Sequence, residues 1–233
     1  MQHSSDTRQI LSVALPPLVL SAMSGAALAC ASGWNLGIFI GGLLLTTLLL
    51  PPILLATDRP IHRVIAFLAA VNPIALTFGI AWWRSDMWAR ELASSLGILI
   101  GYAIALAGFT CALRSIRLSA TVSAAVAVLV GLAWLTCPIW LSRTWNGEAS
   151  ANWVGKLGAL HPGLALNIPS LGQWAEQSVA YHLTELNQSV PYAPPHSVWM
   201  CVFLHTLIGA ALLGLSVVIA RRDAEVPAVH DGL

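Results

Sequence analysis

The stretch LASSLGILIGYAIALAGFTCAL at residues 92–113 contains no aspartate, glutamate, lysine or arginine. A helix needs about 20 consecutive, mostly apolar residues to cross the hydrocarbon core of a bilayer, and this stretch is long enough. Lipid offers no water to the backbone, so a helix, which pairs its own polar groups, is the structure expected there. We therefore interpret this stretch as a membrane-spanning helix.

The composition of the whole chain agrees with this interpretation. The 233 residues are 57% hydrophobic and 9% charged, with a mean hydropathy of +0.76. A soluble domain carries roughly 25% charged residues, so a globule of this composition would have too few polar side chains to cover its surface. The net charge of +1 gives no reason to expect a nucleic-acid partner. The sequence predicts an all-α polytopic membrane protein whose main partner is the lipid bilayer.

Six apolar stretches have the length of a membrane span, and we treat residues 1–233 as a single transmembrane domain. The predicted spans cover about 10–31, 36–56, 64–83, 92–113, 120–141 and 198–220. A polar segment at 142–197 separates the last two spans. Its imperfect apolar stripe predicts short amphipathic helices lying at the membrane surface. The first stretch is longer than the apolar core of a cleaved signal peptide, so we expect it to be retained.

Arginines indicate the orientation of these spans. In a six-span layout one side of the membrane receives Arg8, Arg59, Arg63, Arg114, Arg117, Arg221 and Arg222. Positive charge in short loops marks the cytoplasmic side. Both termini are therefore predicted in the cytoplasm, and the segment 142–197 is predicted outside.

Small residues recur at a spacing that suits helix packing in lipid. Glycine occupies every fourth position at Gly33, Gly37 and Gly41. The same spacing recurs at Gly97 and Gly101. Such faces let two helix backbones approach closely. Packing within one subunit and contact with a second copy both fit the pattern.

Prolines interrupt several spans. Pro16-Pro17, Pro51-Pro52, Pro73 and Pro138 lie inside or near the ends of apolar stretches. Proline has no backbone N–H and collides with the carbonyl four residues earlier, so each position predicts a kink or a broken helix.

The absence of charge inside the predicted spans excludes several mechanisms. Ion-coupled carriers, proton pumps and voltage sensors use charged side chains within the membrane. The chain also lacks the GxxxxGK[ST] sequence of a nucleotide-binding loop, so it does not hydrolyse ATP by that route. Any energy for transport must come from a partner.

The sequence offers few residues for catalysis or metal binding. Cys201 and His205 lie four residues apart, and so share a face of the last predicted span as a thiol–imidazole pair. His161, His182 and His196 lack the spacing of metal ligands. The four cysteines form no CxxC pair. We predict no cofactor, no metal and no enzymatic activity.

The last third of the chain, roughly 128–222, resembles the C-terminal part of ABC-2-type permeases. The resemblance rests on a fifth span, the outer sequence LHPGLALN (160–167), a stretch from Trp174 to Tyr181, the sequence YAPPHSVW (192–199), a sixth span and the closing ARRD (220–223). It implies six spans with both ends in the cytoplasm of a bacterial plasma membrane. It also implies a second permease copy and a separate P-loop ATPase subunit as partners.

The same resemblance suggests roles for two groups of residues. The loop between spans two and three reads ATDRPIHR, without the acidic, glycine-containing stretch usual in the family, and it offers Asp58, Arg59, His62 and Arg63 for contact with the ATPase. An outer gate would be formed by His161, Pro162, Trp174, Tyr181, Tyr192 and Trp199.

Two other classes of protein remain open on the sequence. The chain fits a structural subunit of a larger respiratory or photosynthetic membrane complex, with His205 or His62 touching a cofactor. It also fits an intramembrane hydrolase that uses Cys201 and His205, although no third group orients the pair.

Overall fold

The computed structural model describes residues 2–31, 42–57, 59–84, 89–141, 160–166 and 198–225. Within these ranges every regular element is a helix and no strand occurs, which confirms the all-α class for this part of the chain. The elements are α1 (Gln2–Ala31), the 3₁₀ turn η1 (Thr47–Leu49), α3 (Leu50–Leu55), α4 (Pro60–Arg84), α5 (Ala89–Ser115), α6 (Ala120–Leu141), α8 (Pro162–Ala165) and α11 (Trp199–Glu225).

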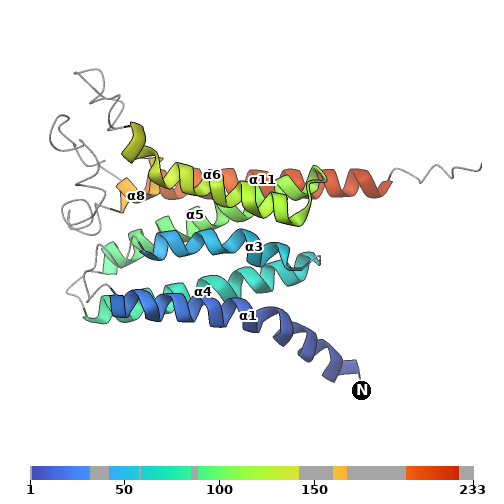
Figure 1. Ribbon diagram of the computed structural model, residues 1–233, viewed down its shortest axis with the longest axis horizontal. Helices are drawn as coiled ribbons and strands as arrows, with labels where there is room; N and C mark the ends of the chain where they lie inside the picture. The colour runs from blue at the N-terminus through green and yellow to red at the C-terminus, as the bar shows by residue number, and fades with distance from the viewer. Residues whose placement is uncertain are drawn as a thin grey trace, which may run out of the picture.

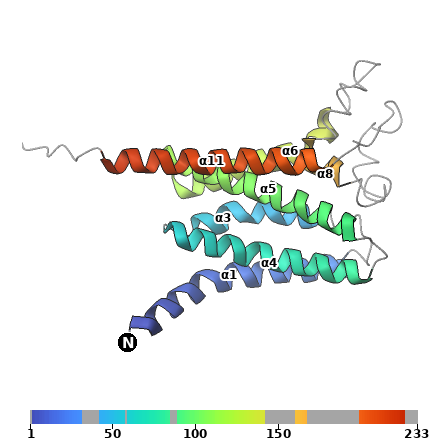
Figure 2. The same ribbon diagram turned by 180° about the vertical axis from the view of Figure 1, so that it is seen from behind.

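The long helices lie side by side in an elongated bundle (Figures 1 and 2). α1 packs on α4, α3 lies between α4 and the pair α5–α6, and α11 packs along α5. The start of α1 and the end of α11 lie at one end of the bundle, and the short α8 lies at the opposite end (Figure 1). We call the end that carries α8 the α8 end and the other the arginine end.

Four of the described helices are long and apolar enough to cross a membrane. They contain the stretches Arg8–Ala27, Ala93–Ser115, Ala120–Cys137 and Trp199–Arg222. These stretches overlap four of the six predicted spans, which supports a multi-pass membrane protein. Shorter apolar helices, Gly42–Leu55 and Ile61–Thr77, overlap the other two.

The prolines affect these helices in different ways. Pro51 and Pro52 stand in the first turn of α3, directly after η1. Pro51 cannot donate to the carbonyl of Thr47, and that carbonyl instead accepts the N–H of Leu50 in a tighter turn. α1 and α4 continue through their own prolines, and α1 bends along its length (Figure 1).

Glycines bring the backbones of α5 and α11 into direct contact. A β-carbon built at Gly108 would lie 2.9 Å from the Cα of Gly209. One built at Gly209 would lie 2.6 Å from the carbonyl carbon of Ile104. Real β-carbons do not approach other atoms this closely, so only glycine fits both positions. Gly97 and Gly101 lie on the same side of α5, facing Val202 of α11. Gly33, Gly37 and Gly41 lie outside the described residues.

α1 and α4 meet through a similar small-residue contact. A β-carbon at Gly25 would lie 2.6 Å from Oγ1 of Thr77. Thr77 donates its hydroxyl proton to the carbonyl of Pro73 at 2.6 Å, so the polar side chain is satisfied within its own helix. The bundle thus contains two closely packed helix pairs, α1–α4 and α5–α11.

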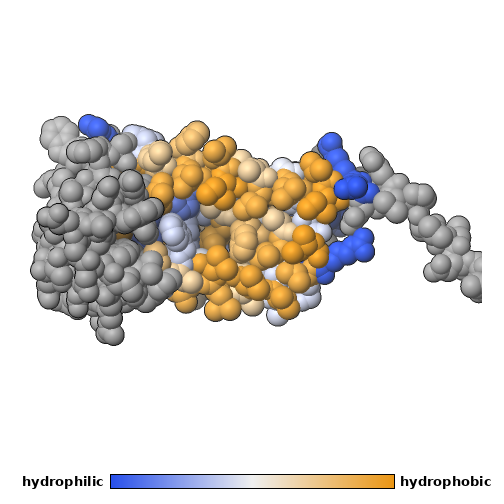
Figure 3. All heavy atoms as spheres, turned by 90° about the horizontal axis from the view of Figure 1, so that it is seen from above, coloured by the Kyte–Doolittle hydropathy of each residue, from blue (hydrophilic) through white to orange (hydrophobic). Residues whose placement is uncertain are grey.

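The surface of the bundle is apolar along most of its length. Figure 3 shows a broad hydrophobic belt with hydrophilic side chains at the arginine end. Large apolar side chains point outward from several helices, among them Leu68, Leu76, Leu129, Phe203 and Val218. An apolar outer surface of this kind suits contact with lipid, because the side chains lose no water there.

The contact between Gly108 and Gly209 predicts a strong asymmetry between two glycines of α11. Gly209→Leu should lower the free energy of unfolding by about 1–3 kcal/mol or more, since the new side chain meets backbone atoms of α5. Gly214→Leu is the matched control, because a β-carbon there meets nothing within 4 Å. It should not lower stability, because the site has room for a β-carbon and leucine favours a helix more than glycine does.

The measurement is the thermal aggregation midpoint of each detergent-solubilised variant, fused to a fluorescent protein. Equal midpoints for the two variants would contradict the close α5–α11 contact.

Candidate functional site

α8 is a single helical turn that lies buried at one end of the bundle. Leu164 is 5% exposed, and Ala165 and Leu166 are 0% exposed. Ala165 and Leu166 belong to the main apolar cluster, which also contains Ile98 of α5 and Val198 just before α11. A segment this short has no helical stability of its own, so these tertiary contacts hold it in place.

His161 begins α8 and caps it. Its backbone is extended (φ −85°, ψ 123°), and its Nδ1 accepts the N–H of Leu164 at 3.1 Å. An N-cap side chain of this kind satisfies one of the backbone donors left free in the first helical turn. Pro162 follows at the first helical position, where its missing N–H costs nothing. The sequence His-Pro therefore encodes the start of α8.

The other ring nitrogen of His161 contacts α6. Nε2 lies 2.8 Å from the carbonyl oxygen of Trp134, and the two rings lie 5.3 Å apart between centroids. A carbonyl only accepts, so Nε2 carries the proton and Nδ1 keeps the lone pair that accepts from Leu164. Both ring nitrogens are used, and the geometry assigns one neutral tautomer.

The position of Pro138 explains why the Trp134 carbonyl is available. In an α-helix this carbonyl would accept the N–H of the residue four positions later. That residue is Pro138, which has no N–H. His161 supplies the missing donor from a separate segment, so the proline of α6 and the histidine of α8 form one structural unit.

Burial also keeps His161 uncharged. The side chain is 1% exposed, and its removal from water lowers the pKa of His161 to about 4, with a smaller contribution from His205 nearby. The bond to Trp134 opposes this shift only in part. The neutral form is therefore the one present around pH 7.

Cys201 and His205 lie beside α8 on one face of α11, as their spacing predicts. The Cys201 thiol donates to the carbonyl of Leu160 at 3.4 Å, and Sγ lies 3.5 Å from Nδ1 of His205. That nitrogen donates to the carbonyl of Cys201 at 2.8 Å. The ring of Tyr102 meets the His205 ring edge to face, with centroids 5.8 Å apart.

This geometry does not suit a nucleophilic thiol. The Nδ1 atom of His205 carries a proton for the carbonyl of Cys201, so it cannot accept the proton of the thiol in this arrangement. The thiol proton is itself directed at Leu160. Among the described residues, no three His, Cys, Asp or Glu side chains come together as a metal site.

The arginine end holds the described part of the loop predicted to contact an ATPase. Arg59 is exposed, and His62 is half-buried at the start of α4. Arg63 donates from Nε to the carbonyl of Thr57 at 3.0 Å and also contacts Cys111. Asp58 lies outside the described residues.

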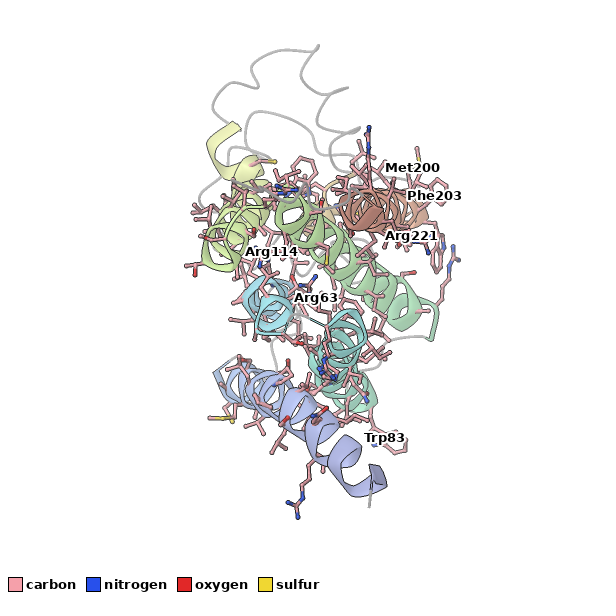
Figure 4. The ribbon with its side chains drawn as sticks, turned by 90° about the vertical axis from the view of Figure 1, so that its right-hand side faces the viewer. Arg63, Trp83, Arg114, Met200, Phe203 and Arg221 are labelled. Atoms are coloured by element: carbon pink, nitrogen blue, oxygen red, sulfur yellow. The ribbon has the colours of Figure 1, made fainter. Side chains whose placement is uncertain are left out.

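Two arginines at this end turn inward and one turns outward. Figure 4 shows Arg63 and Arg114 pointing between the helices and Arg221 pointing away from them. Arg114 donates from Nη1 to the carbonyl of Leu118 at 2.8 Å, which fixes the turn between α5 and α6. The inward arginines therefore have structural roles. The exposed arginines of this end include Arg8, Arg59, Arg117, Arg221 and Arg222.

The residues predicted to form an outer gate divide into three groups. His161 and Pro162 are buried, and His161 contacts α6. Trp199 is 52% exposed on the outer surface of α11. Trp174, Tyr181 and Tyr192 lie outside the described residues.

The sequence analysis did not identify Trp134, Tyr102 or Gly131 as part of this region. The Tyr102 hydroxyl donates to the Gly131 carbonyl at 2.9 Å and so connects α5 to α6.

Comparisons with protein-family models, with curated proteins and with solved structures find no match to this chain.

The pairing of Pro138 with His161 predicts a measurable coupling. His161→Ala should destabilise the protein by about 1–3 kcal/mol, because the buried carbonyl of Trp134 loses its partner. In a Pro138→Ala background the N–H of residue 138 satisfies that carbonyl, and the same His161→Ala change should cost clearly less. The measurement is a double-mutant cycle on the unfolding free energy in detergent.

Pro73→Ala in α4 provides the matched control, and its effect should add to that of His161→Ala within about 0.5 kcal/mol. Additive effects for Pro138 and His161 as well would rule out the proposed exchange of donors.

Proposed function

We propose that this protein is the membrane-spanning, permease-type subunit of an ABC transporter, with six spans and both termini in the cytoplasm of a bacterial plasma membrane. A second permease copy and a separate ATPase subunit complete the transporter. Substrate crosses between the permease subunits, and the ATPase provides the energy.

The observation that carries this proposal is the separation of features between the two ends of the bundle. The buried α8 marks one end, and helix termini rich in arginine mark the other. Between them, residues 93–113, 120–141 and 199–220 contain no charged side chain. These three spans offer no Asp, Glu, Lys or Arg for proton or ion coupling, so we infer that a partner drives any transport.

The arginine end offers the surface for such a partner. Arg59, Arg221 and Arg222 are exposed there, close to the membrane boundary expected from the apolar belt. Positive charge on this side fits the cytoplasm, where an ATPase would dock. The α8 end then faces outside, which agrees with the outer position proposed for the segment 142–197.

Photo-crosslinking tests the proposal. A photoreactive amino acid at position 59 should crosslink to a subunit that hydrolyses ATP when the chain is expressed in its native membranes. The same amino acid at position 83 is the matched control, because Trp83 is 84% exposed, near the other end of α4. Position 83 should give no such product.

Two results would contradict the proposal. One is a crosslink to the ATPase from position 83 alone, which would reverse the orientation. The other is a purified complex that contains only redox proteins and shows a haem or chlorophyll absorbance band. That second result would favour the structural subunit of a respiratory or photosynthetic complex.

A further inference from the structure

Residues 160–166, here called the lid, cover part of α11 at the α8 end of the bundle. The carbonyl of Leu160 accepts the proton of the Cys201 thiol, and Cys201 is 1% exposed. Ala165 and Leu166 belong to the same apolar cluster as Cys201. The lid thus lies against a buried thiol of α11.

The His161 side chain makes the polar contact between the lid and α6 that the described residues show. His161 accepts from Leu164 within the lid and donates to Trp134 of α6. A proton added to Nδ1 removes the lone pair that receives the Leu164 N–H. It also places a positive charge in a site that is 1% exposed. The docked lid is therefore compatible with the neutral imidazole alone.

The backbone contacts of His161 with Trp134 and Leu135 favour its protonated form only in part, and no described acidic side chain adds to them. The titratable side chains that share the apolar cluster of the lid or act on His161 are Tyr102 of α5 and Cys201 and His205 of α11, and none of them is an acid. The acids of these helices lie near helix ends, Glu91 in the first turn of α5 and Asp223 and Glu225 in the last turn of α11. His205 would add a second positive charge if it were protonated, and its influence already disfavours charge on His161.

We propose that residues 160–166 form an acid-released lid, in which protonation of His161 at Nδ1 detaches the segment from α6 and exposes Cys201. The proton comes from the solution outside the membrane. The Trp134 carbonyl, which Pro138 leaves without a helical donor, then takes a water molecule as its donor. This inference concerns a conformational change and holds whether or not the chain transports a substrate.

The expected pH dependence follows from linkage. The pKa of His161 is about 4 with the lid docked, against 6.5 for a histidine in water. The open lid therefore binds the proton more tightly. Between pH 6.5 and 4 the ratio of open to closed lids should rise by about tenfold for each unit that the pH falls, and above pH 6.5 it should stay constant.

The test measures the reactivity of Cys201 towards 4,4′-dithiodipyridine. The other three cysteines are replaced by alanine, and the protein is held in lipid nanodiscs between pH 7.5 and 4.5. Each rate is divided by that of a reference protein, Met200→Cys with Cys201→Ser, whose thiol replaces a side chain that is 56% exposed. This ratio removes the intrinsic effect of pH on the reagent.

Three variants give distinct expected results. With His161 present, the normalised rate should rise as the pH falls below 6.5. With His161→Gln it should not change with pH, whatever its absolute value, because the side chain does not titrate. With His161→Ala it should be high at every pH, since the bond to Trp134 is absent.

A normalised rate that stays constant with pH in the presence of His161 would overturn the proposal. So would a pH-dependent rise of equal size in His161→Gln, which would indicate general unfolding. Crosslinking from position 59 to an ATPase is a separate measurement, so failure of the permease assignment and failure of the lid are distinguishable.

Discussion

The carbonyl oxygen of Trp134 is the group on which the α8 end of the bundle depends. In apolar surroundings a backbone acceptor without a donor costs free energy, and Pro138 removes the donor that the helix would supply. His161 replaces it with Nε2–H at 2.8 Å. That single bond fixes the tautomer of the ring, orients Nδ1 towards Leu164 and so allows α8 to begin. The end of α6 at Pro138 and the start of α8 at His161 therefore depend on the same hydrogen bond.

The rest of the bundle depends on shape more than on polar contacts. Gly108 and Gly209 let α5 and α11 touch backbone to backbone, and Gly25 of α1 leaves room for the side chain of Thr77 in α4. Lipid is as apolar as the hydrophobic side chains of these helices, so moving them from lipid into a helix–helix contact gains little free energy. Close packing therefore provides much of the association between helices. α3 directly follows η1 and lies between these two tight pairs, in contact with α4, α5 and α6.

Much of the architecture was predictable from the sequence, because membrane spans are defined by length and by the absence of charge. The stretch 92–113 contains enough apolar residues to identify a helix without reference to its neighbours. The close contact of Gly108 and Gly209 was not predictable in the same way, since it joins two helices that are distant in the chain. His161 was selected as part of an outer gate, but its partner was missed. The available signal was Pro138, whose position four residues after Trp134 indicates a carbonyl without a donor.

The dependence of α6 on His161 also has a consequence for biosynthesis. A chain that enters the membrane from its N-terminus completes α6 before residue 161 is synthesised, so the Trp134 carbonyl first lacks its protein donor. The thiol of Cys201, which meets the carbonyl of Leu160, arrives later still. The α8 end of the bundle therefore gains these contacts only after α6 has been completed. Water or a lipid headgroup must serve the carbonyl during that interval, which favours keeping the end of α6 at the membrane surface until the chain is finished.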